Sequence, residues 1–165
     1  MSAKAGEEQR DPRAEALRQR LLYGAVLLMA LGLLHHADHA IRGEIVVDNG
    51  LDPDWNHSGW PFQDRVTPFT ASLAIYVPIV VGIALTLRRR AVATYWLWTA
   101  VVLGAILALV HFLPGNPRTE WPSVIYDTYG AALPGALALL VLFALLVALV
   151  VQIGQAIRLR RASRS

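Results

Sequence analysis

The sequence has no cysteine and few charged residues. The absence of cysteine from all 165 residues excludes disulfides, thiolate metal ligands, iron–sulfur clusters and cysteine nucleophiles. Charged side chains make up only 16% of the chain, whereas 55% of the residues are hydrophobic and the mean hydropathy is +0.44. An ordinary soluble domain carries about 25% charged residues. The composition therefore indicates an integral membrane protein.

Several local motifs of common enzyme classes are also missing. There is no Gly-x-Ser-x-Gly elbow and no phosphate-binding loop. The stretch Asp52-x-Asp54-x-Asn56 begins like a calcium loop, but His57 replaces the required glycine and Gln63 replaces the final glutamate. No nucleic-acid partner is expected, because the basic residues lie beside apolar segments, where membrane topology explains them. The hydrophobic runs and the five histidines remain as the informative features.

Four hydrophobic segments are each long enough to cross a hydrocarbon core of about 30 Å as an α-helix. They cover residues 21–41, 69–87, 91–113 and 133–153. The predicted fold is all-α, a four-helix transmembrane bundle that forms a single domain over residues 21–157. Residues 1–20 are a polar cytoplasmic segment that is expected to become helical from Pro12, and residues 158–165 are a basic cytoplasmic tail. Pro78 and Gly82 are expected to bend the second span.

The distribution of charge orients the spans. Twelve of the fifteen basic residues fall on the side that holds both termini, and eight of the twelve acidic residues fall on the other side. By the positive-inside rule both termini are cytoplasmic, an N-in/C-in topology in the inner (plasma) membrane. All five histidines then lie on the extracytoplasmic side. The turn-rich loop 43–66 is expected to form an ordered cap over that end.

The first span ends in an unusual run of ionisable residues, His35-His36-Ala37-Asp38-His39-Ala40-Ile41-Arg42. At about 100° per residue, four of these side chains share one face of the helix, and His36 lies at its edge. The four are His35, Asp38, His39 and Arg42. Ionisable groups at the end of an apolar helix are costly unless something is paired or bound there. His111, near the end of the third span, is expected at a similar depth.

Two histidines four residues apart present their imidazoles on one helical face, as metal ligands require. His35, His39 and His111 are therefore predicted ligands, with Asp38 as a fourth ligand or as the carboxylate that orients a ring N–H. Such nitrogen and oxygen ligands suit Zn, Fe, Mn or Cu. Additional candidates at the same end are His36, Glu120 and Asp127. Two alternatives stay open, a haem b held by a first-span histidine and His111, and a polar network that binds nothing.

Arg42 and Arg65 lie on the extracytoplasmic side, against the topological trend. Each is expected to have an anionic partner, which is a lipid phosphate, a carboxylate substrate, or Asp38 and Asp64. These arginines are the candidate anchors for a lipid headgroup or a small anionic substrate. If the protein is an enzyme, a metal-bound water would act on a lipid-borne substrate.

The competing functional hypothesis is non-enzymatic. In it the protein is an accessory or structural subunit whose polar end docks onto a larger membrane complex or onto another copy of the chain. The lipid bilayer is a partner under both hypotheses.

Three segments in the first two spans and the loop between them carry a distinctive combination of residues. They read His-His-x-Asp-His-x-x-Arg-Gly at 35–43, Ser-Gly-Trp-Pro at 58–61 and Val-Thr-Pro-Phe-Thr-x-Ser-Leu at 66–73. This pattern resembles an uncharacterised group of small prokaryotic four-span membrane proteins. The resemblance implies the four-span fold and implies no particular reaction.

Overall fold

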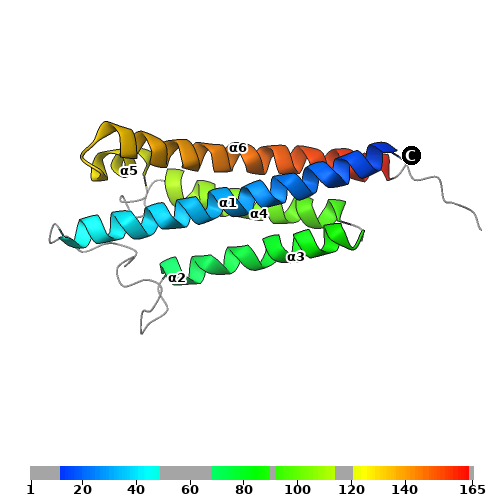
Figure 1. The fold of residues 1–165 in the computed structure, drawn as a ribbon, viewed down its shortest axis with the longest axis horizontal. Helices are drawn as coiled ribbons and strands as arrows, with labels where there is room; N and C mark the ends of the chain where they lie inside the picture. The colour runs from blue at the N-terminus through cyan, green and yellow to red at the C-terminus, as the bar shows by residue number, and fades with distance from the viewer. Residues whose placement is uncertain (1–11, 49–67, 90–91, 114–120, 164–165) are drawn as a thin grey trace, which may run out of the picture.

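The computed structural model describes residues 12–48, 68–89, 92–113 and 121–163. Helices account for nearly all of these residues, and no strand occurs among them (Figure 1). In chain order the helices are α1 (Pro12–Asp48), α2 (Pro68–Ser72), the 3₁₀ helix η1 (Leu73–Ile75), α3 (Tyr76–Leu87), α4 (Ala93–Phe112), α5 (Pro122–Thr128) and α6 (Ala132–Ala162).

Four helical segments are long and apolar enough to cross a membrane. They are Pro12–Gly43, Thr70–Leu87, Ala93–Phe112 and Ala132–Ala162. Each corresponds to one predicted span, and the second consists of α2, η1 and α3 joined end to end. The prediction of an all-α four-helix bundle is confirmed. The first helix begins at Pro12, as expected, but it continues to Asp48, five residues past the predicted start of the loop at Gly43. Most of that loop lies outside the described residues.

The two long helices α1 and α6 run antiparallel and share the most extensive interface (Figure 1). The buried positions of both helices recur at intervals of three and four residues. On α6 these are Gly135, Ala138, Leu142, Leu145, Ala148, Leu149, Gln152, Ala156 and Leu159. On α1 they include Leu21, Ala25, Leu28, Gly32, His35, His39 and Arg42. This spacing produces the seam of a left-handed antiparallel bundle, and its small residues let the backbones approach. The histidines therefore occupy positions that are hydrophobic elsewhere along the seam.

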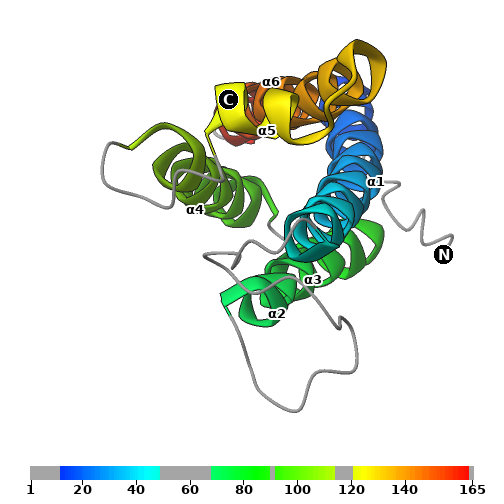
Figure 2. The ribbon, with the colours of Figure 1, turned by 90° about the vertical axis from the view of Figure 1, so that its left-hand side faces the viewer.

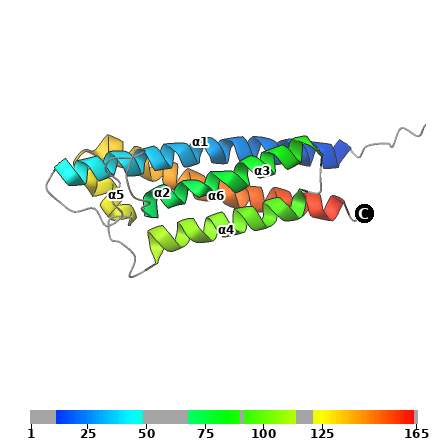
Figure 3. The same cartoon turned by 90° about the horizontal axis from the view of Figure 1, so that it is seen from below.

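The remaining spans complete a ring of four helices (Figure 2). In the end view α1 and α4 lie opposite each other, with α6 between them on one side and α3 on the other. The packed pairs are α1 with α6, α6 with α4, and α1 with α3, whereas α3 and α4 share little contact. A side chain on α4 must therefore cross the interior of the bundle to meet α1. Figure 3 shows α4 running along α6 on the side away from α1.

Two hydrogen bonds join the beginning of α4 to α3, one of them near Arg89 and the other near the start of α3. The indole N–H of Trp96 donates a hydrogen bond to the Thr86 hydroxyl (2.8 Å), and the Tyr95 hydroxyl donates to the Pro78 carbonyl (2.7 Å). Gly82 lies against the Trp96 ring, where a Cβ atom would come within 2.5 Å of a ring carbon. We call the end of the bundle near Arg89 the arginine end, and the opposite end the histidine end.

Pro78 disturbs the second span, as the sequence predicted. A proline has no N–H for the carbonyl four residues earlier, which is that of Ala74. The chain tightens into the 3₁₀ helix Leu73–Ile75 just before this point. Ser72 and Tyr76, on either side of the 3₁₀ segment, both contact His36 on α1.

Candidate metal centre

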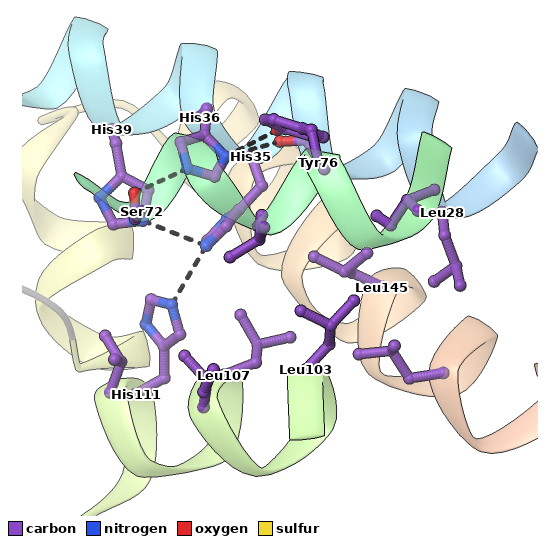
Figure 4. A pocket seen from close by; sticks show the side chains of 16 residues that line it. Leu28, His35, His36, His39, Ser72, Tyr76, Leu103, Leu107, His111 and Leu145 are labelled. Carbon is purple, nitrogen blue, oxygen red and sulfur yellow. Dashed lines mark hydrogen bonds between the residues drawn. The ribbon is translucent and has the colours of Figure 1, made fainter. Parts of the chain in front are cut away.

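Three of the predicted ligands meet inside the histidine end of the bundle (Figure 4). The Nε2 atom of His35 lies 3.1 Å from Nε2 of His39 and 3.1 Å from Nε2 of His111. One ligand atom from each of these residues lies within 4.8 Å of the others, close enough for the three to hold one metal ion. All three side chains are buried. His35 and His111 are thus at the same depth, as predicted, and they come from helices on opposite sides of the bundle.

Hydrogen bonding alone does not account for the position of His35. An imidazole nitrogen carries either one proton or one lone pair, so it makes one well-formed hydrogen bond. His35 Nε2 has two histidine nitrogens at 3.1 Å. Its other ring nitrogen, Nδ1, is buried and has no hydrogen-bond partner among the described residues. A buried polar atom without a partner costs about 1–3 kcal/mol. An ion at Nε2 would relieve the crowding of the two histidine nitrogens around that atom, while Nδ1 would keep its present surroundings.

The spacing of the nitrogens agrees with metal coordination. Around a tetrahedral zinc ion with bonds of about 2.0–2.1 Å, two ligand nitrogens are roughly 3.3–3.4 Å apart. The observed separations of 3.1 Å from His35 to His39 and to His111 are close to this value. The third separation, from His39 to His111, lies within 4.8 Å, so an ion would require these two rings to move closer to the tetrahedral value.

Asp38 is engaged elsewhere. Its Oδ2 atom accepts a hydrogen bond from Arg42 Nε (3.0 Å) in a buried ion pair, and its Oδ1 atom accepts one from the Tyr129 hydroxyl (2.6 Å). Burial and the Asp38 carboxylate raise the pKa of Tyr129 above its ordinary value, so this hydroxyl keeps its proton and donates. The structure pairs Asp38 with Arg42, one of the partners the sequence suggested for that arginine. The two contacts leave neither carboxylate oxygen free of a partner.

His36 belongs to a separate polar group. Its Nε2 atom is 2.9 Å from the Ser72 hydroxyl, and its Nδ1 atom is 2.8 Å from the Tyr76 hydroxyl and 3.1 Å from the Gly32 carbonyl. These contacts fasten α1 to the segment that runs from α2 into α3. Within the described residues, His36 is a link between helices and is not a member of the three-histidine group.

Of the other candidates, only Asp127 belongs to the described residues, and it is not part of the three-histidine group. Asp127 lies exposed on α5. Arg65 and Glu120 lie outside the described residues, so their predicted roles stay predictions. The sequence analysis did not identify Tyr76 and Tyr129 as parts of the site. The sequence does contain a signal for the helix that precedes Tyr129. Pro122 follows Trp121 at the first position of α5, where proline is common, and Tyr129 comes directly after that helix.

A cavity of about 90 Å³ begins at the three histidines and continues between the helices (Figure 4). The polar part of its lining consists of the three clustered histidines together with His36, Ser72 and Tyr76. The rest of the lining is aliphatic apart from Gly32, and every span contributes to it. Examples are Leu28 from α1, Ile79 from α3, Leu107 from α4 and Leu145 from α6. The cluster therefore opens onto an apolar space, not onto a polar one.

Comparison with known proteins offers no function to transfer. No protein-family model matches the chain, and no match is found among curated proteins or among solved structures. The assignment of function therefore depends on the chemistry of the residues that meet at the histidine end.

Proposed function

We propose that this protein is a membrane-embedded metal-binding protein whose ion is held by His35, His39 and His111. The observation that carries the proposal is the convergence of three buried Nε2 atoms, two of them 3.1 Å from His35 Nε2. Nitrogen ligands of this kind suit Zn, Fe, Mn or Cu. Since metal binding needs neutral imidazoles, a buried and desolvated cluster is well suited to it.

Three protein ligands leave a fourth position for an exogenous molecule. Structural zinc sites are closed by four protein ligands, whereas catalytic sites use three and keep one position open. Among the described residues, the acid nearest in sequence, Asp38, is already bound by Arg42 and Tyr129. We propose on this basis that the centre is of the open kind.

A bare ion is favoured over haem b. Axial histidines bind haem iron from the two sides of a wide planar ring, so they must stand apart with the ring between them. Here three histidines crowd within 4.8 Å, and the adjoining cavity is about 90 Å³. Pockets for drug-sized and larger ligands measure about 300–1,000 Å³.

The charge distribution supports a location on the extracytoplasmic face of the inner membrane. Within the described residues, Arg88, Arg89, Arg158, Arg160 and Arg161 all lie at the end opposite the histidines. The positive-inside rule places such an end in the cytoplasm.

The decisive experiment is elemental analysis of the full chain, purified in mild detergent without chelator and then titrated with Zn²⁺. We expect about one ion per chain for the natural protein. The variants His35→Ala, His39→Ala and His111→Ala should each lose the bound ion, because two nitrogens hold an ion far less tightly than three.

His36→Ala is the matched control. It removes a buried histidine from the same helix, but one that hydrogen-bonds Ser72 and Tyr76 and is not among the three residues whose ligand atoms converge. It should keep the ion. Circular dichroism and gel filtration verify that each variant is folded. A folded natural protein that binds no Zn²⁺, or a His111→Ala variant that retains full stoichiometry, would overturn the proposal.

A further inference from the structure

We infer that the histidine cluster serves a molecule with a hydrocarbon chain, with its polar end at the three histidines and the adjoining part of its chain in the aliphatic cavity. This inference rests on the proposed metal centre for the polar end. The cavity supports the binding of the chain independently.

The lining of the cavity selects for hydrocarbon. Beyond the histidine end, its walls come from Leu28, Ile79, Leu103, Leu145 and Leu149, without a charged side chain. Apolar cavities of this kind stay dry and bind apolar molecules, and one of 150 Å³ in another protein holds benzene. At about 90 Å³ this space takes a few carbon atoms next to the polar group of a ligand.

The rest of a longer chain has a route out of the bundle. Ile106 lines the cavity and is also 46% exposed on the surface of α4 that faces lipid. On the other side of the cavity stand Ile75 and Tyr76, from the span beside α4 that shares little contact with it. The cavity thus reaches the hydrocarbon phase between α3 and α4, where bilayer lipids can enter sideways.

The orientation of the cavity matches that of a membrane lipid. His39 and Leu28, the outermost lining residues on α1, are eleven residues apart in the chain, about 16 Å along the helix axis, from the end of the span toward its middle. A lipid of the same leaflet has its polar group at the membrane surface and its chain directed toward the midplane. The polar end would meet the histidines without turning the molecule.

A small anionic substrate fits the site less well. Its predicted anchor, Arg42, is buried and directs Nε to the Asp38 carboxylate at 3.0 Å. Arg42 also does not line the cavity that opens from the histidines. Of the two substrate classes that the sequence suggested, the lining favours the lipid-borne one.

The inference can be tested by photocrosslinking in vesicles. The probe is a long-chain fatty acid that carries a diazirine near its carboxyl end, and crosslinked positions are mapped by mass spectrometry. The full chain is examined both loaded with Zn²⁺ and after treatment with a chelator. Exposed residues such as Leu109 will be labelled in any case, so the informative positions are buried ones that line the cavity.

We expect labelling of Leu145 and Leu149, which are buried on α6 and line the cavity. Leu142 is buried on the same helix but does not line the cavity, and it should stay unlabelled. The variant Leu107→Phe fills the cavity and should abolish labelling of Leu145. The matched control Leu109→Phe, on the lipid-facing side of the same helix, should not.

The outcomes separate this inference from the metal proposal. If Zn²⁺ binds but Leu145 and Leu149 are never labelled, or are labelled equally in Leu107→Phe, the hydrocarbon inference is wrong while the metal centre stands. If both are labelled in a protein that binds no Zn²⁺, the metal proposal fails and the polar end of the ligand is not held by an ion. Labelling that is stronger with Zn²⁺ than after chelation supports both.

Discussion

At the scale of single residues, a change at Tyr129 can test whether the ion pair of Asp38 and Arg42 is independent of the metal centre. It donates to the Asp38 carboxylate at 2.6 Å, in a contact between the turn after α5 and the end of α1. Removing a hydrogen bond to a charged group costs about 1.5–3 kcal/mol. We expect Tyr129→Phe to lower the stability measured by thermal unfolding in detergent by about this amount, without changing Zn²⁺ stoichiometry. Loss of Zn²⁺ at unchanged stability would show instead that Asp38 serves the ion.

The buried pair of Asp38 and Arg42 makes a second residue-level prediction. Removing one member of such a pair leaves an uncompensated charge and costs about 3–5 kcal/mol, whereas replacing both by apolar side chains is often neutral. Arg42→Met alone should therefore destabilise the protein strongly, and Asp38→Leu combined with Arg42→Met should recover part of the loss, since Asp38→Leu also removes the acceptor of the Tyr129 hydroxyl. Chemical or thermal unfolding of the two variants is the measurement. If the double variant is as unstable as the single one, the pair has a role beyond mutual neutralisation.

At the scale of helices, Gly82 of the second span allows close packing of α3 against α4. A methyl group on Gly82 would come within 2.5 Å of the Trp96 ring, whereas one on Gly154 of α6 meets nothing within 4 Å. Overpacking typically costs about 1–3 kcal/mol. Gly82→Ala should lower thermal stability, and the control Gly154→Ala should not. Equal effects of the two substitutions would mean that helix propensity, and not the contact with Trp96, determines the result.

The four spans could be predicted because each is a long apolar run, and length and hydropathy are enough to define a transmembrane helix. The end of α1 could not be predicted in this way. Glu44 and Asp48 are polar and suggested a loop, yet they continue the helix. The short helix α5 was missed for a related reason, since seven residues form too short a segment to show a periodic pattern.

The site was predictable along one helix and not across helices. The spacing of His35 and His39 places both on one face at any depth in the membrane, so their pairing followed from the sequence. The approach of His111 depends on which way α4 faces, and α4 is apolar on nearly all sides. The role of Asp38 depended on Tyr129, ninety-one residues away. Such partners are set by packing, for which the sequence carries no local signal.

At the scale of the whole molecule, the absence of cysteine makes the topology easy to test. Ser123 on α5 lies at the histidine end and Ser163 lies after α6 at the arginine end, and both are exposed. Single variants Ser123→Cys and Ser163→Cys would each carry the only thiol of the protein. In intact cells a membrane-impermeant maleimide should label Ser123→Cys only, and both after lysis. If only Ser163→Cys is labelled in intact cells, the orientation is opposite to the predicted one.

The position of His111 has a consequence for the stability of the whole bundle. His35 and His111 are seventy-six residues apart in the chain and belong to helices on opposite sides of the ring. An ion bound by both would join α1 to α4 and close a long loop, and such a clip lowers the entropy of the unfolded chain as a disulfide does. In a protein without a single thiol, imidazoles would then supply the cross-link. We expect a chelator to lower the unfolding temperature of the natural protein, Zn²⁺ to restore it, and neither to affect His111→Ala.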